Sequence, residues 1–235
     1  MEKPSLAKYN IEIHKDKGIG YWRNLYLKFL EHMDCDSIIE FGSGSPSFLN
    51  AVKAKRKVAL DSGDKYIKNF HESKIEFYEL DFDKDSMPQL GIFDIAICSD
   101  VFEHLLYPDK TLYNIKTSLS KTGVLFSHVP NEFTFKKTFS IMLGMSESLY
   151  FHKNCEEYCD PHLHRFTKIG YEKFLKLHFQ YNLFISDLKY SRQLKLLQLL
   201  GLPVPYTFQG GPTFISTNDC DTYNKLIDLK SKLSS

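Results

Sequence analysis

The sequence predicts an α/β fold in which a mostly parallel β-sheet is flanked by helices. Apolar runs of strand length alternate with helical patterns along the chain, and this alternation implies right-handed crossovers and a parallel sheet. The first apolar run enters a glycine-rich turn that contains Gly42 and Gly44, and the second ends on Asp61, seventeen positions after Gly44. This order is typical of a βαβ unit that wraps around a nucleoside, because glycines let the backbone approach the ligand and an acid binds ribose hydroxyls.

The first half of the chain contains five expected strands. An amphipathic helix at 19–33 precedes them, with apolar residues from Tyr21 to Met33 on one face. A helix is expected to begin after Pro46, and another is expected at 108–119. The strands are expected near 37–41, 57–61, 75–80, 93–98 and 123–129.

The second half departs from this alternation at residues 131–165, which are rich in Phe, His and Met and follow no clear period. We expect a lid or substrate-specific insertion there. Together with an N-terminal helical segment at 1–35, all elements are expected to form a single domain over residues 1–235. Beyond the insertion, the patterns predict a helix at 168–179, a strand at 183–188, a short apolar helix at 192–200 and a final strand at 212–216, which we expect to be antiparallel.

Composition restricts the class of partner. The 235 residues suit one domain with a substantial core. The net charge is +1 and the basic residues are scattered, so we expect neither a nucleic acid nor a membrane as partner. The start of the chain lacks the apolar run of a secretory signal, and the five cysteines are odd in number. These features favour a cytoplasmic protein with reduced thiols.

Several further segments extend the glycine-loop pattern. They are Glu40–Ser45, Asp61, Asp81, the run 93–104 and the run 123–131. In this order and spacing they resemble class I S-adenosylmethionine-dependent methyltransferases of the small-molecule type, over about residues 36–131. The resemblance implies a Rossmann-like, seven-stranded sheet and S-adenosyl-L-methionine as cofactor. Pro46 departs from the pattern, since many members have a further glycine there, but proline is also favoured at the first position of a helix.

The resemblance also implies which residues bind the cofactor. Asp61 would accept hydrogen bonds from the ribose hydroxyls, and Asp81 would accept one from the adenine amino group while the Phe82 backbone meets a ring nitrogen. Glu40 is expected to face a cationic or amine-bearing ligand. The full set expected around the cofactor is Glu40, Gly42, Ser43, Gly44, Asp61, Ser62, Asp81, Phe82, Ser99 and Asp100.

The acceptor side is expected to use histidines. The Glu103–His104 pair after the fourth strand resembles a pair found in many small-molecule methyltransferases, and His104 could act as general base near neutral pH. A helix-start role for both residues is the alternative. The stretch 161–167 resembles one that lines the acceptor pocket in related enzymes. It supplies the expected substrate-binding residues His162, His164 and Arg165.

A group of cysteines and histidines follows the expected fifth strand. Residues 152–164 hold two thiols and three imidazoles, which could form a zinc site. The cysteine spacing is loose and no second cysteine pair follows, so we expect no bound metal. The four residues that this alternative would use are His152, Cys155, Cys159 and His162.

The N-terminal segment contains aromatic residues that could contact the cofactor. Tyr21 or Trp22 could face the sulfonium as an aromatic ring faces a cation, although helix packing is the simpler role. The same segment includes Tyr9 and His14.

The sequence therefore predicts an enzyme that moves a methyl group from S-adenosylmethionine to an O or N atom of a small polar acceptor, such as a sugar, a nucleotide-sugar or a small amine. One alternative is a cofactor-binding protein without catalysis. The other is a nicotinamide-dependent oxidoreductase, which is disfavoured because Ser47 stands where the dinucleotide fingerprint needs its third glycine.

Overall fold

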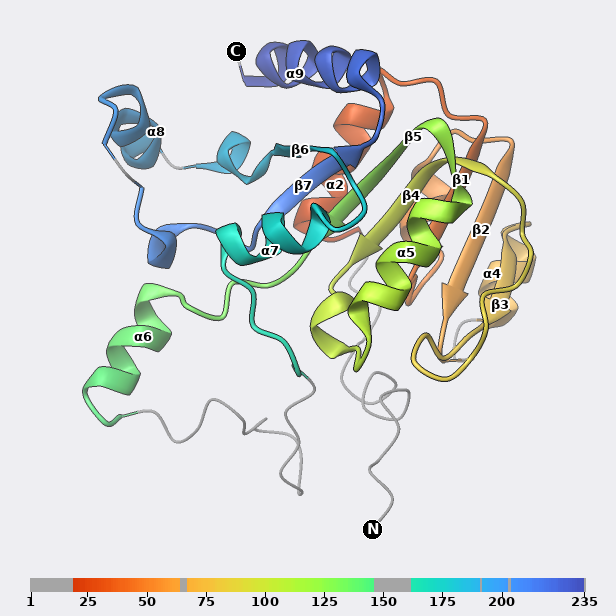
Figure 1. Ribbon diagram of the computed structural model, residues 1–235, viewed down its shortest axis with the longest axis horizontal. Helices are drawn as coiled ribbons and strands as arrows, with labels where there is room; N and C mark the ends of the chain where they lie inside the picture. Colours follow the sequence, from red (N-terminus) through yellow and green to blue (C-terminus); the bar gives the residue numbers. More distant parts are fainter. Residues whose placement is uncertain (1–18, 64–66, 146–161, 191, 203, 235) are drawn as a thin grey trace.

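A seven-stranded sheet forms the centre of the molecule (Figure 1). The computed structural model describes residues 19–63, 67–145, 162–190, 192–202 and 204–234. The strand order is β3-β2-β1-β4-β5-β7-β6, and β7 runs antiparallel to both of its neighbours. The expected seven-stranded, mostly parallel sheet with an antiparallel final strand is confirmed. The strands are β1 (Ser37–Phe41), β2 (Arg56–Asp61), β3 (Glu76–Glu79), β4 (Phe93–Ser99), β5 (Leu119–His128), β6 (Tyr181–Phe184) and β7 (Thr213–Thr217).

Helices cover both faces of the sheet. The α-helices of the described residues are α2 (Tyr21–Leu30), α3 (Ser47–Ala51), α4 (Ile67–Glu72), α5 (Pro108–Ser118), α6 (Phe135–Met142), α7 (Lys168–Leu175), α8 (Arg192–Leu199) and α9 (Cys220–Ser234). Short 3₁₀ turns are η1 (Phe102–His104), η2 (Ser186–Lys189) and η3 (Tyr206–Phe208).

The core consists of two apolar layers because successive residues of a strand point to opposite faces. In β1, Ile39 packs with apolar residues of α5 and α7, whereas Ile38 packs with residues of α2, α3, α4 and α9. Figure 1 shows α5 and α7 on the near face of the sheet and α2 on the far face. Strands β1 and β4 are buried on both sides, which explains why their sequences read as continuous apolar runs.

The register brings three strand ends together. Phe41, the last residue of β1, pairs with Leu60 on one side and with Cys98 on the other. The residues that follow these pairs, Gly42 and Asp61 among them, therefore lie at one edge of the sheet. In parallel α/β sheets this carboxyl edge is where ligands bind.

Some expected elements differ in the structure. The helix expected at 19–33 spans 21–30, and its buried residues are Leu25, Tyr26, Phe29 and Leu30, whereas Tyr21 is 55% exposed. The strand expected at 183–188 lies at 181–184, and the chain then turns into η2. The insertion 131–165 includes a helix, α6, that its aperiodic composition did not predict, and residues 146–161 lie outside the described part.

Helix α9 was not expected, although a signal for it is present. Asp219 accepts a hydrogen bond from the Thr222 amide, as a helix-capping residue does. Leu226 then packs into the core, with Tyr223 and Leu229 beside it, at helical spacing. Among the residues that the structure describes, none of the helices combines the length and apolar character needed to cross a membrane.

Candidate functional site

The glycine turn after β1 is shaped by two left-handed backbone conformations. Gly42 has φ +70° and Gly44 has φ +61°, values that L-residues with side chains adopt at a cost. A Cβ atom at position 42 would lie 2.3 Å from the Cγ2 atom of Val101, whereas one at position 44 would meet no atom within 4 Å. The amides of Gly42 and Ser43 both donate to the carbonyl of Leu60. Ser43 is fully buried. The turn is therefore fixed against β2 while its Gly44 side faces open space.

Asp61 ends β2 directly beside this turn. Its carboxylate accepts hydrogen bonds from the Gly44 amide at 2.8 Å and from the Gly63 amide at 3.0 Å. Burial raises the pKa of Asp61, and the amides of Gly44, Gly63 and Ser62 oppose that rise. The structure thus brings together the predicted residues of the glycine turn and its partner acid.

Glu40 lies in β1, next to the strand that ends at Asp61, and its side chain is fully buried against a cation of the protein itself. Its carboxylate lies 2.9 Å from a guanidinium nitrogen of Arg23 in α2. Burial raises the pKa of Glu40 to about 7, because the attraction of Arg23 offsets only part of the desolvation and Asp61 adds repulsion. Glu40 was expected to face a cationic ligand, but the cation beside it is Arg23. The same guanidinium lies 3.5 Å from the carbonyl oxygens of Gly42 and Ser43.

Asp81 and Phe82 follow β3 at the same edge. The Asp81 carboxylate pairs with Lys84 at 3.0 Å and accepts the Asp83 amide. Partial burial would raise its pKa, but these two contacts lower it. Phe82 is buried, with its ring 5.9 Å from that of Phe41. Asp81 therefore lies at the edge as an ionised acid, and its contact with adenine stays a prediction.

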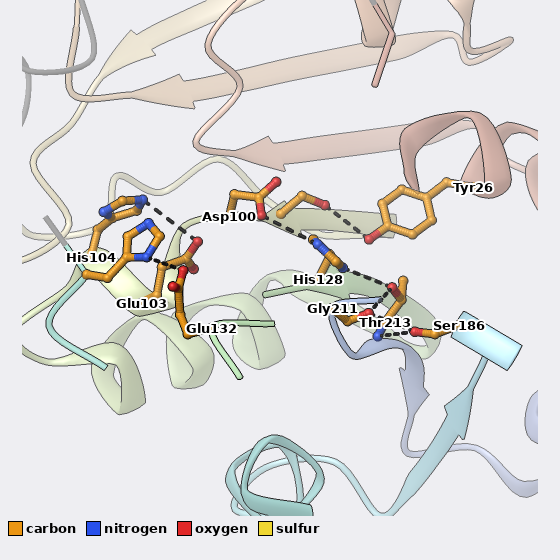
Figure 2. Close-up of polar contacts among 11 residues, drawn as sticks. Tyr26, Asp100, Glu103, His104, His128, Glu132, Ser186, Gly211 and Thr213 are labelled. Carbon is orange, nitrogen blue, oxygen red and sulfur yellow. Dashed lines mark hydrogen bonds and ion pairs between the residues drawn. The ribbon is translucent and has the colours of Figure 1, made fainter. Parts of the chain in front are cut away.

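Ser99 is the last residue of β4, and Asp100 follows it beside a group of polar side chains that includes His128 and Thr213 (Figure 2). The Ser99 hydroxyl is 3.1 Å from the Tyr26 hydroxyl. Asp100 has φ +56°, a strained conformation for a residue with a side chain and one that concentrates at functional sites. Its amide donates to the carbonyl of His128, while its side chain is 58% exposed.

His128 was missed by the sequence analysis. It ends β5, and its Nδ1 atom lies 2.9 Å from the Thr213 hydroxyl while its Nε2 atom lies 3.6 Å from the Asp100 carboxylate. The Trp22 ring packs 4.8 Å from the imidazole, so Trp22 contacts this network. The only signal for His128 in the sequence is its place at the end of an apolar run.

The lowered pKa of His128 makes the free energy of unfolding depend on pH. Burial lowers its pKa from 6.5 to about 4, although Asp100 acts in the opposite direction. The unfolded chain therefore takes up a proton between pH 6.5 and 4 that the folded chain does not, and this contribution to stability is lost as the pH falls through that range. We expect it to lower the free energy of unfolding by about 2 kcal/mol between pH 7 and pH 5.

Urea denaturation at both pH values checks this expectation. His128→Gln, which does not ionise, should show a smaller loss between pH 7 and pH 5 than the parent protein. Equal losses in the two proteins would mean that His128 is protonated in the folded state.

A second polar cluster is formed by Glu103 and His104 of η1 with Glu132 (Figure 2), and His162 belongs to it through its contacts with Glu132 and His104. The His104 Nε2 atom lies 3.7 Å from a carboxylate oxygen of Glu103, and the rings of His104 and His162 are 4.7 Å apart. The Nδ1 atom of His162 lies 2.9 Å from Glu132. The structure thus places the predicted catalytic histidine beside one of the predicted substrate-binding histidines.

The other two predicted acceptor residues, His164 and Arg165, follow His162 closely in the chain. His164 donates a hydrogen bond from Nε2 to the Leu105 carbonyl at 3.0 Å. This bond holds its ring against the backbone that follows η1. Arg165 is half-buried. Of the remaining candidates, Tyr9, His14, His152, Cys155 and Cys159 lie outside the described residues.

The chain matches a known protein family. A family profile described as "Methyltransferase domain" matches residues 14–207, which is most of the chain. No curated protein matches the sequence.

Solved structures of low identity share the fold. An S-adenosylmethionine-dependent methyltransferase from Clostridium acetobutylicum ATCC 824 is 13% identical with a TM-score of 0.59, over 89% of this chain and 96% of that one. The plantazolicin methyltransferase BpumL, in complex with a triazolic desmethylPZN analog and SAH, is 17% identical with a TM-score of 0.61, over 90% and 91%. A Haloferax volcanii methyltransferase in complex with the activator Trm112 is 15% identical with a TM-score of 0.56, over 91% and 94%. The chain belongs to the methyltransferase domain family and is an S-adenosylmethionine-dependent methyltransferase.

Proposed function

We propose that this methyltransferase acts on an oxygen or nitrogen atom of a small polar acceptor, which binds beside Glu103, His104 and His162. The observation that carries this proposal is that two half-buried imidazoles and two carboxylates converge at the carboxyl edge of the sheet. The edge also holds the glycine turn and Asp61. Polar groups of this kind in a partly buried site suit an acceptor that exchanges hydrogen bonds and protons.

The residues of the glycine turn fit the cofactor. The open space at Gly44 leaves room for a ligand against the backbone, and Asp61 presents a carboxylate to that space, held by two amides. We propose that Asp61 binds the ribose hydroxyls and Asp81 the adenine amino group. Ser99 and Asp100 would line the methionine half. When bound, S-adenosylmethionine supplies a methyl group on a sulfonium sulfur, which a nucleophile displaces in line.

The acceptor residues would orient the nucleophile and remove its proton. His104 is 17% exposed and close to Glu103, so its imidazole can accept a proton in a site that contains little water. Alignment of the acceptor supplies a large part of the rate in such displacements. The BpumL structure, which holds an acceptor analog together with SAH, supports a small-molecule acceptor on this fold.

Transfer of a labelled methyl group tests the proposal. The protein is incubated with S-adenosylmethionine carrying an isotopic methyl label and a fraction of small metabolites, and the products are analysed by mass spectrometry. We expect the label on an oxygen or nitrogen of a small molecule. Labelled macromolecules with unlabelled metabolites would overturn the acceptor class, and cofactor binding without any transfer would favour a binding protein.

A further inference from the structure

We propose that Glu103, His104 and His162 form a binding site for one divalent metal ion, with Glu132 positioning His162. No bound metal was expected from the sequence, and the zinc alternative used Cys155 and Cys159 together with His152 and His162. The proposed site shares only His162 with that alternative, and its ligands come from two segments almost sixty residues apart.

The distances between the side chains suit an ion. One ligand atom from each of the three residues can be chosen so that all three lie within 4.8 Å of one another. The His104 Nε2 atom and the nearer Glu103 oxygen are 3.7 Å apart. Ligands that each lie about 2.0–2.2 Å from a metal are about 3–4 Å from one another. Only a small contraction of the cluster would therefore complete the site.

Glu103 is the strongest reason to expect a cation. Its side chain is 1% exposed, and neither carboxylate oxygen has a hydrogen-bond partner among the described residues. Asp100 and Glu132 bring further negative charge near it. A buried carboxylate without a hydrogen-bond partner is strongly unfavourable, and a divalent cation between Glu103 and the imidazoles would neutralise it.

Glu132 orients His162 for metal binding. A carboxylate only accepts hydrogen bonds, so the Nδ1 atom of His162 donates its proton to Glu132 at 2.9 Å. The ring nitrogen that can bind a metal is then Nε2. Lys137 contacts the same carboxylate and keeps it ionised. A histidine that donates one ring N–H to a carboxylate is the usual arrangement of a metal-binding histidine.

The backbone holds the two segments together. The amides of Leu163 and His164 donate to the Glu103 carbonyl at 2.7 and 3.0 Å, and the His164 ring donates to the Leu105 carbonyl. Because these bonds attach 162–164 to η1, His162 lies over His104 as a result of the fold rather than of a chance side-chain rotamer.

The ligand set indicates the kind of ion. Two imidazoles with a carboxylate suit Zn²⁺, Fe²⁺ or Mn²⁺, and three protein ligands leave a coordination position open, as in catalytic sites. This last step rests on the proposed function: the open position would take an oxygen atom of the acceptor, which favours a hydroxyl-bearing substrate over an amine. With the ion bound, His104 would act as a ligand and not as the general base.

Metal titration of the full chain, without an affinity tag, tests the site. We expect calorimetry with Zn²⁺ and with Mn²⁺ to show one equivalent bound by at least one of the two ions. Glu103→Gln, which keeps the shape of the side chain, and His104→Ala should each weaken binding at least tenfold, and Glu132→Gln should weaken it about 10- to 100-fold. His178→Ala, which removes an imidazole elsewhere on the molecule, should bind as the parent does.

Two outcomes would overturn the site. One is the absence of stoichiometric binding of either ion. The other is binding that survives Glu103→Gln and His104→Ala but is lost in the double variant Cys155→Ser/Cys159→Ser, which would assign the metal to the cysteine cluster. Co²⁺ loaded in place of the native ion should give a visible absorption band that Glu103→Gln changes.

Methyl transfer is measured separately, so the metal site and the proposed function can fail independently. A protein that methylates small acceptors but binds no metal would refute this site alone. Metal bound as expected without methyl transfer would refute the proposed function alone.

Discussion

Asp61→Ala is expected to weaken S-adenosylmethionine binding by about 2–4 kcal/mol, because it removes charge-assisted hydrogen bonds and leaves the ribose hydroxyls unpaired. The carboxylate also accepts the amides of Gly44 and Gly63, so the substitution loosens the turn that faces the ligand. Both effects act on cofactor affinity. Isothermal titration with S-adenosylmethionine and with its demethylated product measures them, after thermal unfolding has shown that the variant folds.

Two variants sharpen this test. Asp85→Ala removes a carboxylate that bonds the Asp81 amide and that we do not place against the ribose, so it should retain more affinity than Asp61→Ala. Gly44→Val puts a branched side chain into the open space beside the turn and should weaken binding at least as much as Asp61→Ala. An Asp61→Ala protein that folds and binds with the parent affinity would place the ribose elsewhere.

His104→Ala and His162→Ala are each expected to lower methyl transfer tenfold or more, which corresponds to about 1.4 kcal/mol in the barrier. Each removes an imidazole from the cluster proposed to bind the acceptor. Neither residue is among those we place around the cofactor, so the affinity for S-adenosylmethionine should remain within about twofold. The measurements are kcat with the acceptor found by labelling and Kd for the cofactor by calorimetry.

The control for these variants is His178→Ala, whose imidazole lies near Asp109 and away from the cluster. It should retain parent activity. Unchanged turnover in both His104→Ala and His162→Ala would mean that the acceptor binds at another place on the edge. A parallel loss of cofactor affinity would instead assign these histidines to the cofactor half.

The local parts of the site were the predictable ones. The glycine turn and Asp61 belong to one βαβ unit, so their contact follows from a short stretch of chain and from the geometry of parallel strands. The seven-stranded, mostly parallel sheet and its antiparallel last strand came with the family resemblance and are confirmed. Element ends were less predictable, as in the region after β6, because local hydrogen bonds and packing decide where a strand stops.

Contacts between distant elements could not be read from the sequence. Arg23 pairs with Glu40 only because α2 packs across the end of β1, and nothing near Arg23 indicates that packing. His104 and His162 were both candidates, but their proximity depends on amides that bond the Glu103 carbonyl. His128 was missed because a histidine at the end of a buried run has no local signature of its neighbours.

The close approach of Gly42 to Val101 links the two halves of the site mechanically. A single methyl group at position 42 would overlap the Val101 side chain, and Val101 immediately precedes the turn that carries Glu103 and His104. A larger residue at position 42 therefore requires a smaller one at position 101, and a redesign of acceptor preference has to change the two positions together. A side chain added at position 42 would push on the turn that carries Glu103 and His104, whereas position 44 of the same glycine turn has open space beside it.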